Sequence, residues 1–296
     1  MDPVKVGKVK EIYDEGETLL FKFTDKISVF DKIIPSLIPH KGESLCRTAA
    51  FWFKVAEESA HVKTHFREMP SKDEMRVTKY FVPDHKGNPF EVEYVIPIEF
   101  ITRYYVAGSL YDRLKSGEVK PIDIGLNSMP EYGEELDDPF FEMTTKYEKF
   151  DRPLTVGEAM ELGGMSNSEL VEIKEVIYKI DRRMNKQVRN RGLIHVDGKK
   201  EFAFGIRRAP VVIDTFGTAD EDRFWDLEEY EKGNIIDLSK EFVRQYYRDI
   251  SYHERLYAAR EAGEKEPDIP ALPDEMIKKT SDLYVSMFER ITGQKW

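Results

Sequence analysis

The chain has 296 residues, of which 41% are hydrophobic and 12% aromatic, enough for one large core or two adjoining cores. Lysine and arginine number 45 against 56 aspartate and glutamate, and the net charge of −11 repels nucleic acid and anionic lipid. No stretch approaches the roughly 20 apolar residues that cross a bilayer, and the first residues lack the apolar run of a signal peptide. We expect a cytoplasmic protein with small-molecule ligands and without nucleic-acid or membrane partners.

The first residues of the chain predict a hairpin. Residues 4–13 and 18–24 have strand patterns, joined by a turn over residues 14–17. Side chains alternate along a strand, so Lys8 and Lys10 should share one face. The sequence therefore predicts two cations side by side.

A helix and two further strands follow before the expected domain boundary. Residues 44–60 have a helical pattern, in which the single cysteine, Cys46, should be a core residue. Residues 74–82 and 92–106 predict strands, the second long and nearly all apolar. We place the boundary near residue 92, after the turn Asp-His-Lys-Gly-Asn-Pro. It divides the chain into an N-terminal lobe, residues 1–92, and a larger lobe, residues 93–296.

The larger lobe mixes helix and strand patterns. A Thr-x-x-Glu capping box starts a predicted helix over 155–162, and a Ser-x-x-Glu box starts another over 166–191. Residues 201–206 and 210–215 predict the two strands of a hairpin, and residues 239–250 and 274–291 predict two helices. Between these helices, residues 258–274 are charged and interrupted by prolines, which predicts a surface connection. Long apolar strands with segregated helices predict an α+β fold rather than regular βαβ alternation.

Two carboxylates flank the predicted hairpin of the larger lobe. If the chain reverses between Arg207 and Arg208, Glu201 and Asp214 are paired across it. Carboxylates about 4 Å apart repel by roughly 4 kcal/mol at an effective dielectric of 20, which a shared cation reverses. Mg²⁺ commonly takes one or two carboxylates and completes its shell with water and phosphates, so the pair suits a metal–nucleotide site. The alternative is two exposed acids at different edges of an acidic protein.

Two sets of side chains offer complementary charge. Lys8 and Lys10 lie beside a glycine and suit phosphate groups, although no P-loop pattern is present; ordinary exposed lysines are the alternative. Glu99 and Arg103 share a face of the long apolar strand, as a structural ion pair or as part of a ligand site. A guanidinium binds phosphate or carboxylate in bidentate fashion, and the Gly-Ser turn ending at Ser109 can add donors.

Six ordered segments of the chain resemble the motifs of the SAICAR synthetase family, the phosphoribosylaminoimidazole-succinocarboxamide synthases. They are GKVKEIY (7–13), TDKISVFD (24–31), IPHKGESLCRTAAFWF (38–53), VIPIEFITRYYVAGS (95–109), HVDGKKEF (195–202) and DTFGTADEDRFWD (214–226). The resemblance spans about residues 7–250. It implies ATP-dependent joining of L-aspartate to the carboxylate of carboxyaminoimidazole ribotide through an acyl phosphate, giving SAICAR, ADP and phosphate. It also implies a nucleotide lobe resembling those of kinases and ATP-grasp enzymes, a ligand cleft between the lobes, and ATP and Mg²⁺ as cofactors.

The resemblance assigns the nucleotide end of the site. Lys8 and Lys10 match phosphate-contacting lysines of the family. Glu201 and Asp214 match its magnesium carboxylates, with Glu201 also at the ATP site. Lys146 is a weaker match.

The resemblance also assigns the substrate end. Arg103 and Ser109 match positions that hold the ribotide, and Arg223 matches a further substrate-binding arginine. Glu99 is expected to orient Arg103. Asp31 matches an aspartate near the substrate cleft.

The remaining matches concern the reacting groups and a loop that departs from the family. Asp197 and Lys199 match the Asp-x-Lys that precedes the family glutamate, and we expect them near the reaction as catalytic residues. The family usually has Asp-Glu-x-Leu-Thr-Pro-Asp-Ser-Ser-Arg, whereas this chain places Glu221 and Asp222 before Arg223. The stretch after Lys-Tyr-Glu is also shorter than usual, and its family histidine has no counterpart. The altered loop leaves substrate contacts and acceptor specificity open.

Two other functions are compatible with the sequence. A related ATP-dependent ligase would use another amine in place of aspartate, which the altered loop allows. A catalytically silent nucleotide-binding protein would hold ATP without turnover, although the retained Glu201 and Asp214 argue against it. The sequence leaves the oligomeric state open, and a homo-oligomer is compatible with it.

Overall fold

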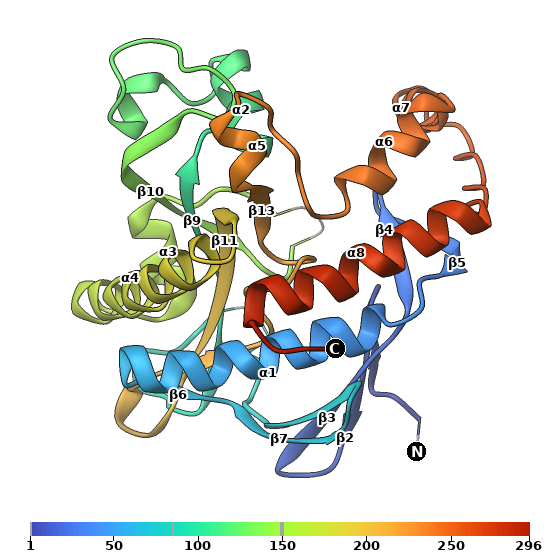
Figure 1. The fold of residues 1–296 in the computed structure, drawn as a ribbon. Coiled ribbons are helices and arrows are strands. Elements are labelled where there is room, and N and C mark those ends of the chain that lie inside the picture. The colour runs from blue at the N-terminus through green and yellow to red at the C-terminus, as the bar shows by residue number, and fades with distance from the viewer. Residues whose placement is uncertain (1, 85, 149–150) are drawn as a thin grey trace.

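The computed structural model describes residues 2–84, 86–148 and 151–296. His85, within the predicted turn before the domain boundary, and residues 149–150, within the shortened stretch after Lys-Tyr-Glu, lie outside the described residues. The described part forms an α+β fold with two main sheets and eight α-helices, as predicted (Figure 1). No helix in the described ranges is long and apolar enough to span a bilayer.

The first sheet is built from the N-terminal residues and has five antiparallel strands in the order β1-β2-β3-β8-β7. The strands are β1 Lys5–Val6, β2 Lys10–Asp14, β3 Thr18–Phe23, β7 Phe66–Ser71 and β8 Glu74–Thr78. The predicted hairpin is confirmed, since Lys10 pairs with Phe23. The prediction of one continuous strand over residues 4–13 was wrong. The chain folds back between β1 and β2, where the Gly7 N–H donates to the Lys10 carbonyl at 2.8 Å, so Lys8 lies in a loop rather than on the face of Lys10.

The second sheet carries the longest strands, in the order β10-β9-β11-β12-β6, with β13 paired to β11. The strands are β6 Lys63–Thr64, β9 Tyr94–Tyr105, β10 Glu135–Thr145, β11 Leu193–Phe204, β12 Pro210–Ile213 and β13 Arg223–Asp226. The long apolar strand is confirmed as β9. Strand β11 begins eight residues before the predicted 201–206, and β6 joins β12 in parallel, so the N-terminal residues supply one edge of this sheet.

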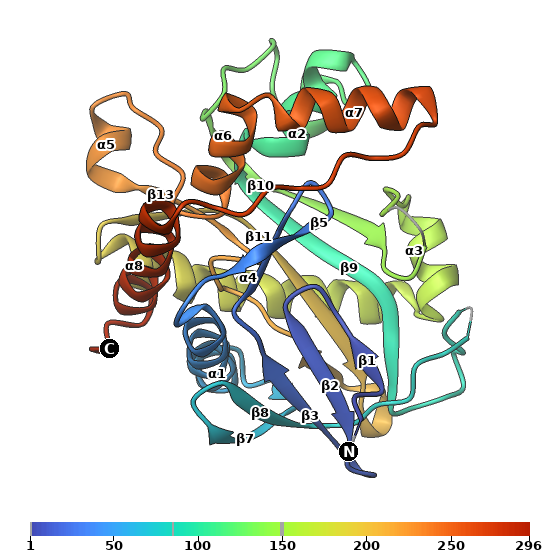
Figure 2. The ribbon, with the colours of Figure 1, turned by 90° about the vertical axis from the view of Figure 1, so that its right-hand side faces the viewer.

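Helices cover the second sheet and connect the two ends of the chain. Figures 1 and 2 show α1 and α8 side by side, and Figure 2 shows α4 behind the long strands β9 and β11. The helices are α1 Lys41–Ala60, α2 Gly108–Ser116, α3 Val156–Gly163, α4 Asn167–Arg189, α5 Leu227–Glu231, α6 Glu241–Asp249, α7 Tyr252–Ala262 and α8 Asp274–Thr292. Both predicted capping boxes are present, Thr155 with Glu158 and Ser166 with Glu169.

The segment after α6 is more ordered than predicted. Residues 258–274 were expected to be a surface connection, but α7 extends to Ala262 and the following residues return to the core. Leu272 is buried, and its N–H donates to the Ser36 hydroxyl at 2.8 Å on strand β5 (Lys32–Leu37), which pairs with β4 (Lys26–Val29). Apolar side chains among the prolines fix this path.

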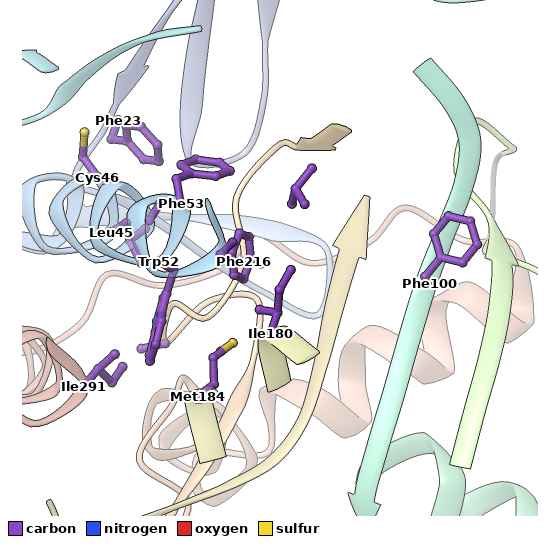
Figure 3. Packing of buried hydrophobic residues seen from close by; sticks show 14 of the residues in the cluster. Phe23, Leu45, Cys46, Trp52, Phe53, Phe100, Ile180, Met184, Phe216 and Ile291 are labelled. Atoms are coloured by element: carbon purple, nitrogen blue, oxygen red, sulfur yellow. The ribbon is translucent and has the colours of Figure 1, made fainter. Parts of the chain in front are cut away.

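The main core is continuous between the two sheets. Figure 3 shows Trp52 and Phe53 of α1 against Phe216 and Met184. Trp52 donates to the carbonyl of Gly217 at 2.9 Å, and a Cβ at Gly217 would lie 2.3 Å from the indole, so this loop position requires glycine. The cysteine at position 46 is fully buried in the same cluster, as predicted. Because the core runs between both sheets, the domain boundary near residue 92 stays a prediction.

Candidate active site

One face of the second sheet collects charged side chains from two adjacent strands. The register places Glu99 of β9 opposite Glu201 of β11, and Arg103 opposite Asp197. Lys199 lies between the two β11 carboxylates in sequence and faces the same side, because alternate residues of a strand share a face. We call these five residues the charged stripe. They were all predicted site residues, and the structure brings them together.

The predicted carboxylate pair forms with a different register. Glu201 pairs with Ile213 rather than with Asp214, because the reversal is centred on Arg207, one half-residue earlier than predicted. Asp214 follows the end of β12 with a φ of 57°. Lys146 nevertheless contacts both carboxylates, with its Nζ 3.6 Å from Asp214 Oδ2 and in an ion pair with Glu201. The prediction that Glu201 and Asp214 pair directly across the hairpin was wrong, but the two acids share the Lys146 ammonium group as a cation.

Three lysines control the charge of this carboxylate pair. Asp214 accepts from Lys10, and although burial favours the neutral acid, the cations Lys10, Lys146 and Lys199 lower the pKa of Asp214 below its usual range. Burial lowers the pKa of Lys146 to about 8, against the opposing effect of Asp214. The Asp214 carboxylate is therefore ionised at neutral pH, while Lys146 titrates only slightly above it.

A cavity of about 550 Å³ adjoins these charges between the two sheets. Its walls are largely apolar, with Leu19 and Phe21 from the first sheet and Val95 and Ile213 from the second. Four charged residues that contact one another, Lys10, Lys146, Glu201 and Asp214, also line it, and so does Lys8. The cavity thus combines an apolar slot with a cluster of ammonium and carboxylate groups.

Arg103 lies at the other end of the charged stripe, where each of its three nitrogens donates one hydrogen bond. Its Nε donates to Glu142 at 2.6 Å, Nη1 to Asp197 at 3.2 Å and Nη2 to the Ser109 hydroxyl at 3.0 Å. Glu142 also accepts from Arg113 at 2.6 Å. The guanidinium is buried and held in a fixed plane by these groups.

Glu99 has a different partner from the predicted one. Its Oε1 accepts from Lys199 at 2.7 Å, so the expectation that Glu99 orients Arg103 was wrong. Residues four apart on a strand share a face, but at about 3.3 Å per residue they lie about 13 Å apart, and Lys199 on the adjacent strand is nearer. Lys199 also lies 3.2 Å from Glu201 and 3.7 Å from Glu221. Burial would lower the pKa of Lys199, but the carboxylates of Glu221, Glu99 and Asp214 raise it above its usual value.

Arg223 explains the glycine of the Gly-Ser turn. Its Nη1 donates to Asp197 at 2.6 Å and its Nε lies 3.2 Å from Asp237. The guanidinium lies against Gly108, where a Cβ would be 2.5 Å from Nη2, and Gly108 has a φ of 52°. The turn therefore needs glycine for both close approach and backbone conformation. It brings Ser109 to the same place as the two arginines.

A second, polar cavity of about 210 Å³ lies beyond Asp197. Arg223 of β13 and Lys240 and Arg244 at the start of α6 border it, together with the acids of the 219–222 loop. Lys240 and Arg244 were missed, because the sequence assigned 239–250 only as a helix. The cavity offers several cations to an anionic ligand.

Asp31 is the predicted site residue that lies apart from the charged stripe. Its carboxylate accepts from Lys8 at 2.6 Å, and the two side chains are 72% and 55% exposed. Lys8 lowers the pKa of Asp31. Within the described residues, Lys8 lines the first cavity and Asp31 lines neither cavity described above.

Other site-forming residues were missed or left open by the sequence. Glu142 and Arg113 support Arg103, but the strand 135–145 was not predicted at all. The sequence left open what the acidic pair at 221 and 222 faces; Asp222 is buried, 2.7 Å from His195. The alternation in Phe-Phe-Glu-Met-Thr-Thr was the available signal for Glu142.

Comparisons with known proteins identify the family of this chain and its fold. The family model described as SAICAR synthetase matches residues 3–258. A phosphoribosylaminoimidazole-succinocarboxamide synthase of Thermoplasma volcanium is 61% identical over 296 residues, covering 100% of both chains. Among solved structures, the SAICAR synthase of Saccharomyces cerevisiae complexed with SAICAR has a TM-score of 0.75 at 24% identity, covering 99% of this chain and 95% of that one. A type-2 SAICAR synthetase in complex with ADP has a TM-score of 0.70 at 23% identity, covering 99% and 98%. At these identities the two structures establish the shared fold. The chain belongs to the SAICAR synthetase family.

Proposed function

We propose that this chain is an ATP-dependent ligase that joins L-aspartate to carboxyaminoimidazole ribotide, giving SAICAR, ADP and phosphate in purine biosynthesis. Membership of the family supports the reaction. The observation on the structure that best supports it is the charged stripe, which runs from the nucleotide-sized cavity at Glu201 to the arginine pair at Asp197. We keep a cytoplasmic location and self-association as predictions.

The first cavity is the proposed ATP site. Its apolar walls suit a base, and Lys8, Lys10 and Lys146, which also line it, suit phosphate oxygens. A family member has been solved with ADP, which supports a nucleotide in this fold. The nucleotide would then present its phosphates to the charged stripe.

The charged residues of this cavity suit Mg²⁺ by the chemistry of their donor atoms. Glu201 and Asp214 provide two carboxylates beside the phosphate-binding lysines, and Asp214 is ionised, as a metal ligand must be. Within the described residues no group of three or more acidic, histidine or cysteine side chains forms a closed metal site. Two protein carboxylates are what an ion that mainly coordinates phosphates and water requires. When bound, Mg²⁺ would neutralise charge on the transferred phosphoryl group.

The other end of the charged stripe is the proposed ribotide site. Arg103, Ser109 and Arg223 lie together and suit a phosphate, while Asp197 holds both guanidinium groups in place. The ribotide carboxylate would then lie near Lys199, between the arginines and the nucleotide. Asp197 would act by positioning and Lys199 by stabilising negative charge near the reacting groups.

The reaction needs no protein nucleophile. A carboxylate is a poor electrophile, so an oxygen of the ribotide carboxylate first takes the γ-phosphoryl group and ADP leaves. The ammonium group of aspartate loses a proton to solvent, and its nitrogen then forms the C–N bond as the C–O bond to phosphate breaks, releasing inorganic phosphate and a second proton. The residues described here contribute alignment and charge neutralisation, which dominate phosphoryl-transfer catalysis.

An isotope experiment tests the acyl phosphate. Ribotide labelled with ¹⁸O in its carboxylate should transfer one ¹⁸O to inorganic phosphate for each SAICAR formed, as read by mass spectrometry of the phosphate. Phosphate without the label, with SAICAR still formed, would contradict this route.

A further inference from the structure

Four carboxylates border the second cavity, and one of them lacks a close partner. Three are tightly held: Asp197 by Arg223 at 2.6 Å, Asp220 by Lys41 at 2.8 Å, and Asp222 by His195 at 2.7 Å. Glu221 is different. Its Oε1 lies 3.4 Å from the Thr215 hydroxyl and its Oε2 lies 3.7 Å from Lys199, and its side chain is 25% exposed. Glu221 is the carboxylate of this cavity with the greatest capacity to accept a ligand.

Glu221 lies where the second cavity meets the charged stripe. It lines the cavity and also forms a long ion pair with Lys199, which donates a hydrogen bond to Glu99. Four carboxylates surround three ammonium groups at this junction: Glu99, Glu201, Asp214 and Glu221 around Lys10, Lys146 and Lys199. One negative charge is in excess. The charge of Mg²⁺ would be more than offset by the polyphosphate that accompanies it, so a cationic ligand group at Glu221 would still be favourable.

The second cavity therefore has the polarity of an amino acid with two carboxylates. Arg223, Lys240 and Arg244 border it and suit the two carboxylates of L-aspartate. Glu221 borders it on the side of Lys199, where the ribotide carboxylate would be activated. Only one orientation of aspartate places its nitrogen toward this reacting end and its carboxylates toward the cations.

We propose that Glu221 binds the ammonium group of the incoming L-aspartate and so selects an amine for the reaction. The inference rests on the proposed function and names the residue that recognises the acceptor nitrogen. The carboxylate of Glu221 can form a charged hydrogen bond to an ammonium group.

The test compares aspartate with succinate, which keeps both carboxylates and lacks the ammonium group. Replacing Glu221 by Gln should raise the KM for L-aspartate at least tenfold, because a charged hydrogen bond is lost. The KM values for ATP and the ribotide should stay within twofold. Competitive inhibition by succinate should be as strong as in the unmodified chain or stronger. Glu221→Asp should recover part of the affinity for aspartate.

Glu175→Gln is the matched control, because Glu175 is exposed on α4 and undergoes the same chemical change. It should leave all three KM values unchanged. If Glu221→Gln weakens aspartate and succinate equally, or raises the KM for ATP and the ribotide in proportion, Glu221 only supports the loop and the inference is wrong. An unchanged KM for aspartate would also overturn it. The unmodified chain tests the proposed function separately: if it shows no turnover, both the ligase function and the role of Glu221 are wrong. If it turns over and Glu221→Gln behaves as the control does, only the role of Glu221 is wrong.

Discussion

Lys41 of α1 and Asp220 of the loop before β13 form a buried ion pair in which Asp220 has more additional partners than Lys41. Lys41 Nζ lies 2.8 Å from Asp220 Oδ2, and the two side chains are 0% and 3% exposed. Asp220 has two further partners, the Tyr284 hydroxyl at 2.6 Å and Lys240 at 3.2 Å. Within the part of the chain that the structure describes, Lys41 has in addition only the ring of Tyr284, 5.3 Å from its Nζ. Removing each partner should therefore have a different cost.

Asp220→Asn should destabilise the fold more than Lys41→Met. The first change leaves a buried ammonium without its counter-ion, which typically costs about 3–5 kcal/mol. The second leaves Asp220 with its other two partners, so we expect about 2 kcal/mol, the value of one charged hydrogen bond. At about 2 °C per kcal/mol for a chain of this size, the Tm should fall by about 6–10 °C in the first case and about 4 °C in the second.

The loss in Asp220→Asn should depend on pH. Burial favours the neutral acid, but Lys240 and Lys41 outweigh it and lower the pKa of Asp220 below its ordinary 3.8. A lowered pKa stabilises the fold above the ordinary value, and this stabilisation is lost as the pH falls further. The gap between Asp220→Asn and the unmodified chain should be full at pH 7 and narrow below pH 3.8.

Urea denaturation followed by circular dichroism measures these differences, as a shift in midpoint at constant m. Equal losses for Asp220→Asn and Lys41→Met at pH 7 would refute the argument from unequal partners. A gap that stays constant below pH 3.8 would refute the assigned pKa of Asp220.

Three further changes test the proposed roles at the site. Asp214→Asn should abolish Mg²⁺-dependent turnover while the protein stays folded, because the amide is a neutral ligand; an unchanged rate and magnesium dependence would remove Asp214 from the site. Arg103→Lys keeps the charge and loses the planar fork, so calorimetry should show ribotide binding weakened more than ATP binding, whereas equal losses would contradict the assignment. The KM for ATP should rise as the pH passes about 8, where Lys146 loses its proton. In Lys146→Arg the KM for ATP should not change with pH over this range. If the KM rises with pH equally in the two proteins, Lys146 is not the cause.

Local patterns in the sequence predicted much of the fold because they depend on near neighbours. The apolar run of β9 and the two capping boxes need only residues within a few positions, and the structure contains all of them. Strand β11 was largely missed, since its alternation is interrupted by charges. One of these, Lys200, is buried in an ion pair with Asp181 of α4, which lies on a different element. A distant partner makes a charged residue compatible with the core, and a strand pattern does not contain that information.

The candidate site depended on register, which the sequence specifies weakly. The hairpin after Glu201 turns through Arg207 and Arg208, each with a φ of 60°, and the glycine of this turn, Gly205, occupies neither of these positions. The prediction was therefore one residue off at Asp214. The family resemblance identified the residues of the charged stripe as site residues. The partner of Glu99 depended on which strand lies beside β9, and the structure shows that it is Lys199 of β11.

The most direct test of the account is ADP release by the purified protein with ATP, Mg²⁺, L-aspartate and carboxyaminoimidazole ribotide, omitting one component at a time. The account predicts that turnover needs all four and that SAICAR forms in equal amount to ADP. ADP release without aspartate, or faster turnover with another amine, would contradict the assigned acceptor. ATP binding without turnover in the complete mixture would contradict the central claim that this chain is a SAICAR-forming ligase.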